Sequence, residues 1–128
     1  YTTEDTLSLH DALPISAGGT GIGVYQAAKD SKKLAIGVDS NQNHLQSGTM
    51  LTSMVKGVDV AVYNAARNHK PGITVLGLKE GGVGYAMDTH NANLVTADMK
   101  KKLEAAKADI ISGKLKVADY MADNTCKY

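Results

Sequence analysis

A glycine-rich turn and an acidic residue about twenty positions after it could together bind a sugar or a nucleotide. The turn, GGTG at residues 18–21, lets backbone N–H groups approach a ligand because glycine has no Cβ. It precedes a predicted helix at residues 21–31, whose N-terminus carries a positive partial charge. Asp39 follows the apolar run at residues 34–38, which predicts a buried parallel strand. Ligands of open α/β sheets bind at the carboxyl ends of strands, so we expect these groups to hold a sugar hydroxyl.

The same layout is typical of a dinucleotide-binding domain of an enzyme, which is the alternative class of function. The glycines do not complete G-x-G-x-x-G, because Val24 stands at the last position. Tyr25 and Lys29 have the spacing Y-x-x-x-K of the catalytic pair in short-chain dehydrogenases. In such enzymes the pair lies much later in the chain, whereas here it falls on the first predicted helix, beside the glycine turn, so it is not a catalytic pair. The histidines lack the spacing of metal ligands, and no carboxylate pairs with Asp39 for acid–base work. We therefore expect a binding site with no catalytic residue, metal or cofactor.

Lys56 is a further candidate for the site. Apolar residues at helical spacing from Met50 to Ala65 predict one helix there, with Lys56 among apolar neighbours. A half-buried lysine needs a partner, and Asp39 or a ligand oxygen would serve. The alternative is a lysine that extends along the helix to water.

The elements that would position these residues alternate along the chain, which predicts an α/β fold. After the strand at residues 34–39 and the helix at about 50–65, a second strand is predicted at residues 74–78. These three would form a βαβ crossover with parallel strands. A short extended piece through Tyr85, a long helix between Thr96 and Gly113, and an edge strand at residues 115–117 complete the prediction.

Composition limits the classes of function that remain. A chain of 128 residues is long enough for one domain with one core. The formal net charge is +1 and the lysines are spread among acidic residues, which argues against nucleic-acid binding. Cys126 is the only cysteine, so an internal disulfide and a thiolate metal cluster are excluded. No stretch of sequence is long and apolar enough to span a bilayer.

Five segments carry a resemblance to a known family. They are AGGTGIGVYQAA, AIGVDSNQ, GTMLTSMVKGVDVAVYNA, VLGLKEGGVGYAMD and IISGKLKV, in that order. Together they resemble the C-terminal part of the basic membrane protein family, the substrate-binding lipoproteins of ABC transporters that include the purine nucleoside receptors. The resemblance implies a type I periplasmic-binding-protein fold, in which two α/β lobes close over a nucleoside and later release it to a membrane permease.

The resemblance also implies which residues line the ligand cleft. They are the backbone of the glycine turn at Gly18 and Gly19, and the side chains of Asp39 and Lys56, with Gln42 and Thr52 as weaker candidates. Two positions depart from the family pattern. Ser47 stands where the family usually has proline, which should loosen a loop. Gly57 stands where it usually has arginine, which should weaken the predicted helix.

The family pattern implies that much of the parent protein lies outside this chain. Residues 6–16, TLSLHDALPIS, resemble a translated sequencing adapter, so we expect residues 1–16 to be non-native and disordered. Residues 17–128 would then be a partial substrate-binding domain that lacks the signal peptide, the lipidated cysteine and the first lobe. The parent would be a monomer, anchored by lipid outside the cytoplasm. We expect the chain alone to bind nucleoside weakly or not at all, and a nonfunctional truncated fragment is a further alternative.

Overall fold

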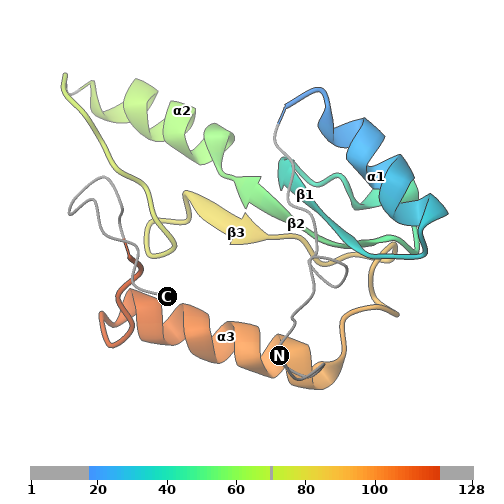
Figure 1. The fold of residues 1–128 in the computed structure, drawn as a ribbon. Helices are drawn as coiled ribbons and strands as arrows, with labels where there is room; N and C mark the ends of the chain where they lie inside the picture. Colours follow the sequence, from blue (N-terminus) through green and yellow to red (C-terminus); the bar gives the residue numbers. More distant parts are fainter. Residues whose placement is uncertain (1–17, 70, 119–128) are drawn as a thin grey trace. The chain divides into compact units, whose positions relative to one another are not determined.

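The chain divides into two compact units, Tyr1–Thr96 and Ala97–Tyr128, in a computed structural model. The structure describes residues 18–69 and 71–118 (Figure 1). The predictions made for residues 1–16 and for Cys126 fall outside these ranges. Within them, no helix is both long enough and apolar enough to cross a membrane.

The first unit is built on a three-stranded mixed sheet with the order β1-β2-β3. Its strands are β1 (Ala35–Asp39), β2 (Met50–Lys56) and β3 (Val83–Tyr85). β1 and β2 are parallel, and β3 is antiparallel to β2. The prediction of an α/β fold is therefore confirmed, and so are the strand that ends at Asp39 and the extended piece at Tyr85.

The predicted helix from Met50 to Ala65 is wrong in its first half. Residues Met50–Lys56 form β2, in which Met50 pairs with Ala35 and Val55 with Asp39. The helix α2 begins only at Val58 and runs to Asn68. Apolar residues of β2 happen to fall at helical spacing, but pairing with β1 decides the conformation, as tertiary context often does.

The predicted βαβ crossover is also wrong, because the parallel neighbour of β1 is β2. These two strands are joined by residues 40–49, which contain the short 3-10 helix η1 (Asn43–Gln46). Residues 74–78 form no strand, and Ile73 and Val75 beside and within this segment are 98% and 84% exposed. The free edge of β2 pairs with β3 instead, which leaves residues 74–78 without a neighbouring strand among the described residues.

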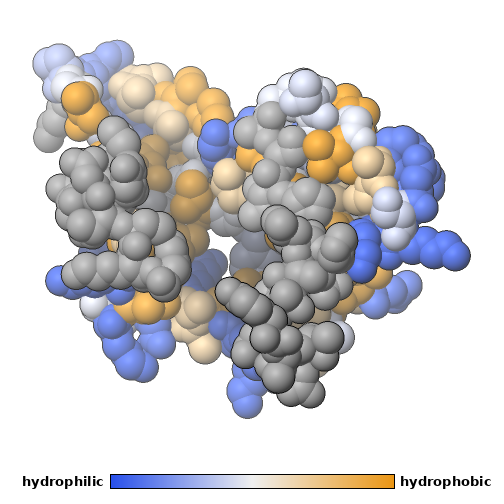
Figure 2. Space-filling model, in the orientation of Figure 1, coloured by the Kyte–Doolittle hydropathy of each residue, from blue (hydrophilic) through white to orange (hydrophobic). Residues whose placement is uncertain are grey.

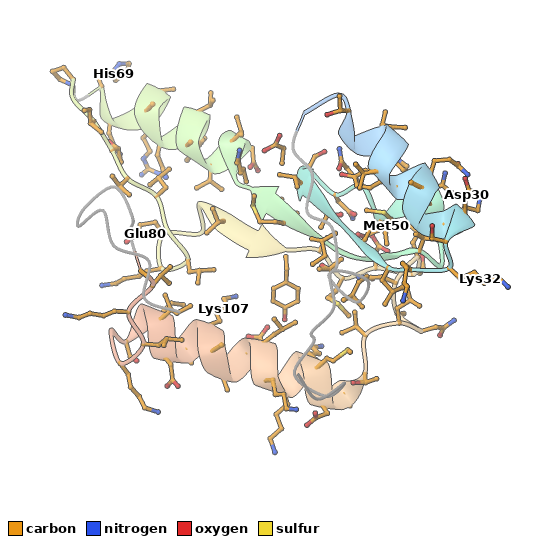
Figure 3. The ribbon with its side chains drawn as sticks, viewed as in Figure 1. Asp30, Lys32, Met50, His69, Glu80 and Lys107 are labelled. Carbon is orange, nitrogen blue, oxygen red and sulfur yellow. The ribbon has the colours of Figure 1, made fainter. Side chains whose placement is uncertain are left out.

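Helix α1 (Gly21–Asp30) covers β1 and forms the core with it. Tyr25 and Ala28 face inward and pack with Ala35 and Met50, and both Ala35 and Met50 are fully buried. Figure 3 shows Met50 beneath α1, while Asp30 lies at the outer end of that helix. The predicted helix at residues 21–31 is confirmed to within one residue.

Helix α2 and the helix of the second unit contain no fully buried residue. In α2, Val58, Val62 and Tyr63 are each more than 60% exposed. Figure 2 shows apolar residues at the surface in the region of α2. The described part of the second unit contains the helix α3 (Ala97–Ile111), which ends near Gly113 as predicted. The edge strand predicted at residues 115–117 does not form.

The two positions that depart from the family pattern both fit their surroundings. Gly57 precedes α2, so it does not weaken a helix, and its N–H donates to the carbonyl of Gly82 at 2.8 Å. A Cβ at this position would lie 2.6 Å from the carbonyl oxygen of Gly81. Ser47 has φ −51°, close to the angle that proline imposes. Its hydroxyl lies 2.7 Å from Nδ1 of His90, a contact that proline could not make.

Candidate functional site

Asp39 ends β1 in an unusual backbone conformation. Its φ is +73°, and the N–H of Ser40 donates to the carbonyl of Val38 at 2.9 Å. Together these define a γ-turn with Asp39 at its apex, a turn type that is rare and strained. Aspartate tolerates positive φ better than most residues, and strained conformations concentrate at functional sites. The turn presents the Asp39 carboxylate at the carboxyl edge of the sheet, half exposed.

Lys56 lies beside Asp39 at the end of the neighbouring strand. Nζ of Lys56 and Oδ1 of Asp39 are 2.5 Å apart, and the two side chains are 53% and 52% exposed. The parallel register explains the pairing, since Asp39 lies opposite Val55 and Lys56 follows directly. Lys56 is on a strand and not on the predicted helix. Of the two partners expected for this lysine, the structure supplies Asp39.

The glycine turn lies at the start of α1. Gly18 has φ +79°, and the N–H of Gly21 donates to its carbonyl at 3.1 Å. Gly18 and Gly19 have nothing within 4 Å of the place where a Cβ would stand. Thr20, the N-cap residue, makes no side-chain hydrogen bond to the helix. The first turn of α1 therefore has no side-chain cap, but the N–H groups of Gly21 and Gly23 donate to the backbone carbonyls of Gly18 and Thr20. The amide groups proposed for ligand oxygens are therefore those of the glycine turn that precedes the helix.

The glycine turn, Asp39 and Lys56 come to the same side of the first unit. Figure 1 shows α1 running antiparallel to β1, so that the start of α1 lies on the side where β1 and β2 end. Figure 3 marks the other end of α1 by Asp30 and Lys32, which point away from the sheet. The arrangement combines amide donors, a carboxylate and an ammonium group at one sheet edge.

The two weaker candidates are held by contacts inside the protein. Oε1 of Gln42 accepts hydrogen bonds from the Tyr25 hydroxyl at 2.6 Å and from the Val38 N–H at 3.1 Å. The Thr52 hydroxyl donates to the carbonyl of Ala86 at 2.8 Å. Thr52 lies opposite Ile36, which places it three residues, roughly 10 Å, back from the sheet edge. The ligand-binding role of these two residues remains a prediction.

A polar network, buried at Ser53 and Asn43 and exposed at Asn41, adjoins the site, and the sequence pattern did not reveal it. The Ser53 hydroxyl donates to Oδ1 of Asn43 at 2.7 Å, and both residues are fully buried. Asp88 accepts hydrogen bonds from Asn41 at 2.7 Å, from Asn43 at 3.2 Å and from the N–H of His90 at 2.7 Å. The hydrogen bond from Asn41 is the main reason that the pKa of Asp88 lies below its ordinary value. The abundance of Asn and Asp in these loops is the one signal that could have indicated the network.

Two observations bear on other candidate sites among the described residues. In residues 18–69 and 71–118, no group of three histidine, cysteine or acidic side chains could hold a metal ion. One cavity of about 310 Å³ lies between α2 and the segment after it, and it contains none of the six predicted ligand-binding residues. Its lining consists of Ala61, Asn64, Ala65, Asn68, Gly72, Thr74 and Leu76.

An α/β unit that gathers amides and a carboxylate at one sheet edge is typical of a protein that binds a small polar ligand. Comparison with known proteins gives the family. A family model, Bmp, described as PnrA-like ABC transporter substrate-binding protein, matches residues 11–120. The chain belongs to this family, as the resemblance of its five segments predicted.

Individual relatives agree with the family. The ABC transporter nucleoside-binding protein BmpA of Lactococcus lactis subsp. cremoris is 35% identical over 130 residues, covering 84% of this chain and 36% of that protein. An uncharacterized lipoprotein of Pyrococcus furiosus is 45% identical over 80 residues, covering 54% of this chain and 20% of the lipoprotein. A crystal structure of a solute-binding protein of an ABC transporter system from Aeropyrum pernix K1 matches with a TM-score of 0.65 and 27% identity. That match covers 80% of this chain and 38% of the other. The chain thus spans well under half of each of these proteins.

Proposed function

We propose that this chain supplies one side of the ligand site of a purine nucleoside-binding protein of an ABC transporter. The observation that carries the proposal is the Asp39–Lys56 pair at the ends of two adjacent parallel strands, on the side of the unit where α1 begins. The family is a substrate-binding one, and BmpA of Lactococcus lactis is named as nucleoside-binding. Both facts support a nucleoside as the ligand.

In this proposal, the Asp39 carboxylate accepts hydrogen bonds from the two ribose hydroxyls. A charged acceptor contributes about 1.5 to 3 kcal/mol for each hydrogen bond when water is excluded. Lys56 holds the carboxylate in place and offers its remaining N–H donors to a ligand oxygen. The amides of Gly18 and Gly19 donate to another oxygen of the ligand. No covalent step is needed, because transport requires only capture and release.

The parent protein would act outside the cytoplasm. Relatives named as lipoproteins, together with the ABC transporter family, support a parent that is anchored to the membrane by lipid and that delivers nucleoside to a permease. One side of a cleft gives fewer contacts than a closed site. We therefore expect weak binding by the 128-residue chain and tighter binding by the full-length protein.

The test is an NMR titration of the 15N-labelled chain, because this method detects weak binding. Inosine should shift the amide resonances of Gly18, Gly19, Asp39 and Lys56, and 2′-deoxyinosine should shift them less at equal concentration. NAD, titrated in parallel, tests the dinucleotide-binding alternative. Resonance shifts with NAD but not with inosine, or shifts confined to the cavity beside α2, would overturn the proposal. Micromolar binding of inosine by this chain alone would show that one side of the cleft is sufficient, against our expectation.

A further inference from the structure

Tyr25 is a buried residue that has no part in the binding proposal so far. The side chain comes from α1, is 1% exposed and packs its ring with Ala28, Ala35 and Met50. Its hydroxyl is the one polar atom of the side chain, and it donates to Oε1 of Gln42 at 2.6 Å. Burial raises the pKa of Tyr25, a hydrogen bond from the Val38 backbone opposes this rise, and the charge of Asp39 adds to it. The hydroxyl therefore lies within electrostatic reach of the proposed ligand acceptor.

Gln42 links the Tyr25 hydroxyl to the turn that carries Asp39. The same Oε1 atom accepts the N–H of Val38 at 3.1 Å, and Val38 in turn provides the carbonyl that closes the γ-turn. The loop is also fixed from β2, because the N–H of Gln42 donates to the Ser53 hydroxyl at 3.0 Å. The Val38 end of this loop is thus held by the Gln42 side chain, which Tyr25 of α1 fixes in turn, and the Gln42 end is held by Ser53 of β2.

A strained turn needs such support. The γ-turn at Asp39 has positive φ, and a conformation of this kind persists only when the surrounding structure fixes it. Replacing the hydroxyl of Tyr25 by hydrogen would leave the ring in the core and remove one of the two donors to Gln42. The turn would then have fewer contacts that hold it in place.

We propose that the Tyr25 hydroxyl is a positioning group for the Asp39 site, because it holds, through Gln42, the γ-turn that presents the carboxylate. The effect of Tyr25 on ligand binding rests on the proposed function. Its effect on the γ-turn does not depend on any ligand. Tyr25 touches no ligand in this proposal. Its effect is on where Asp39 lies.

The first test needs no ligand. Hydrogen exchange of the Val38 and Ser40 amides is measured by NMR in the 128-residue chain and in Tyr25→Phe, with the melting temperature of each. Removal of the hydroxyl should speed exchange of these two amides by roughly tenfold, as expected for the loss of one hydrogen bond. Tyr63→Phe is the matched control, since this tyrosine is 63% exposed on α2. Unchanged exchange at Val38 and Ser40 in Tyr25→Phe would overturn the proposal.

The second test compares the affinities of the unmodified chain, Tyr25→Phe and Tyr63→Phe for inosine and 2′-deoxyinosine. If Tyr25 positions Asp39, then Tyr25→Phe should lower the affinity for inosine. The ratio of the dissociation constants of 2′-deoxyinosine and inosine should then move toward one. A merely structural role would weaken both nucleosides equally and leave the ratio unchanged, which would count against positioning. If the unmodified chain shows no preference for inosine, the proposed role of Asp39 fails, and the hydrogen-exchange result still decides whether Tyr25 holds the turn.

Discussion

Asp39 and Lys56 end two adjacent parallel strands, with Oδ1 and Nζ 2.5 Å apart and both side chains about half exposed. An ion pair this accessible to water contributes little to folding stability, typically about 0 to 1 kcal/mol. The strained γ-turn at Asp39 works against stability as well. The pair therefore contributes little to folding stability, and the proposed ligand-binding role predicts that its substitution changes affinity more than stability.

Asp39→Asn should reduce the affinity of the full-length protein for inosine by about 10- to 100-fold, the equivalent of one charged hydrogen bond. Asparagine tolerates positive φ, so the melting temperature should change little. Asp39→Ala should lose similar affinity but also strain the backbone. Calorimetry with inosine measures the effect, and Asp59→Asn, a change in the first turn of α2, is the control. Full retention of affinity in Asp39→Asn would show that the carboxylate is structural.

Lys56→Gln should also weaken nucleoside binding, by roughly tenfold, because it removes the cation that orients the Asp39 carboxylate. The free energy of unfolding should change by less than about 1 kcal/mol. Lys102 provides a matched control, since it forms a 2.9 Å surface pair with Asp98 on α3. Lys102→Gln should leave binding unchanged. Equal losses of affinity in the two variants would point to net charge and not to the site.

The sequence predicted single elements such as β1 better than the pairing of strands in the sheet. The β1 strand and the position of Asp39 were predictable, because a short apolar run with β-branched residues, followed at once by polar ones, is typical of a buried strand and its end. β2 was assigned to a helix because its apolar residues continue, at helical spacing, into α2. Residues 74–78 have the composition of a strand, but a strand also needs a neighbour, and the sequence of one chain does not show where the neighbour is.

The pairing of Lys56 with Asp39 was expected for a different reason than the structure gives. The sequence indicated that Lys56 needs a partner, and Asp39 was one of two options, but the predicted reason was burial in a helix. The structure gives the strand register as the reason. The internal hydrogen bonds of Gln42 and Ser53 were not predictable, because they depend on side chains from three elements that meet only in the folded chain.

Gly37→Ala should destabilise the fold and disturb the loop after Asp39. A Cβ at residue 37 would stand 2.5 Å from Oγ of Ser53 and 3.0 Å from Cβ of Gln42. Overpacking of this kind costs about 1 to 3 kcal/mol. Urea unfolding measures the cost, and Gly84→Ala is the control, because residue 84 is also in the sheet and has open space at its Cβ position. Equal stability of the two variants would contradict the close packing of Gly37 against Ser53.

The lowered pKa of Asp88 leads to a prediction of how folding stability changes at acidic pH. Hydrogen bonds from Asn41, Asn43 and the N–H of His90 favour the charged carboxylate, and the bond from Asn41 is the largest cause of its lowered pKa. A carboxyl group whose pKa is lower in the folded state contributes stability above its unfolded pKa of about 4, and this stability is lost as the pH falls through the folded pKa. Folding stability falls with pH here because, as the pH is lowered, Asp88 binds a proton in the unfolded chain before it does so in the folded chain.

Asp88→Asn should therefore be less stable than the unmodified chain at neutral pH, and the difference should shrink as the pH falls below about 4. Asparagine retains only one acceptor oxygen, so its NH₂ group must face either the amides of Asn41 and Asn43 or the N–H of His90, all of which are donors. Chemical unfolding of both proteins across this range of pH measures the difference. A difference that stays constant with pH would mean that the Asp88 carboxylate titrates alike in the folded and unfolded chains, and that the hydrogen bonds do not favour its charge.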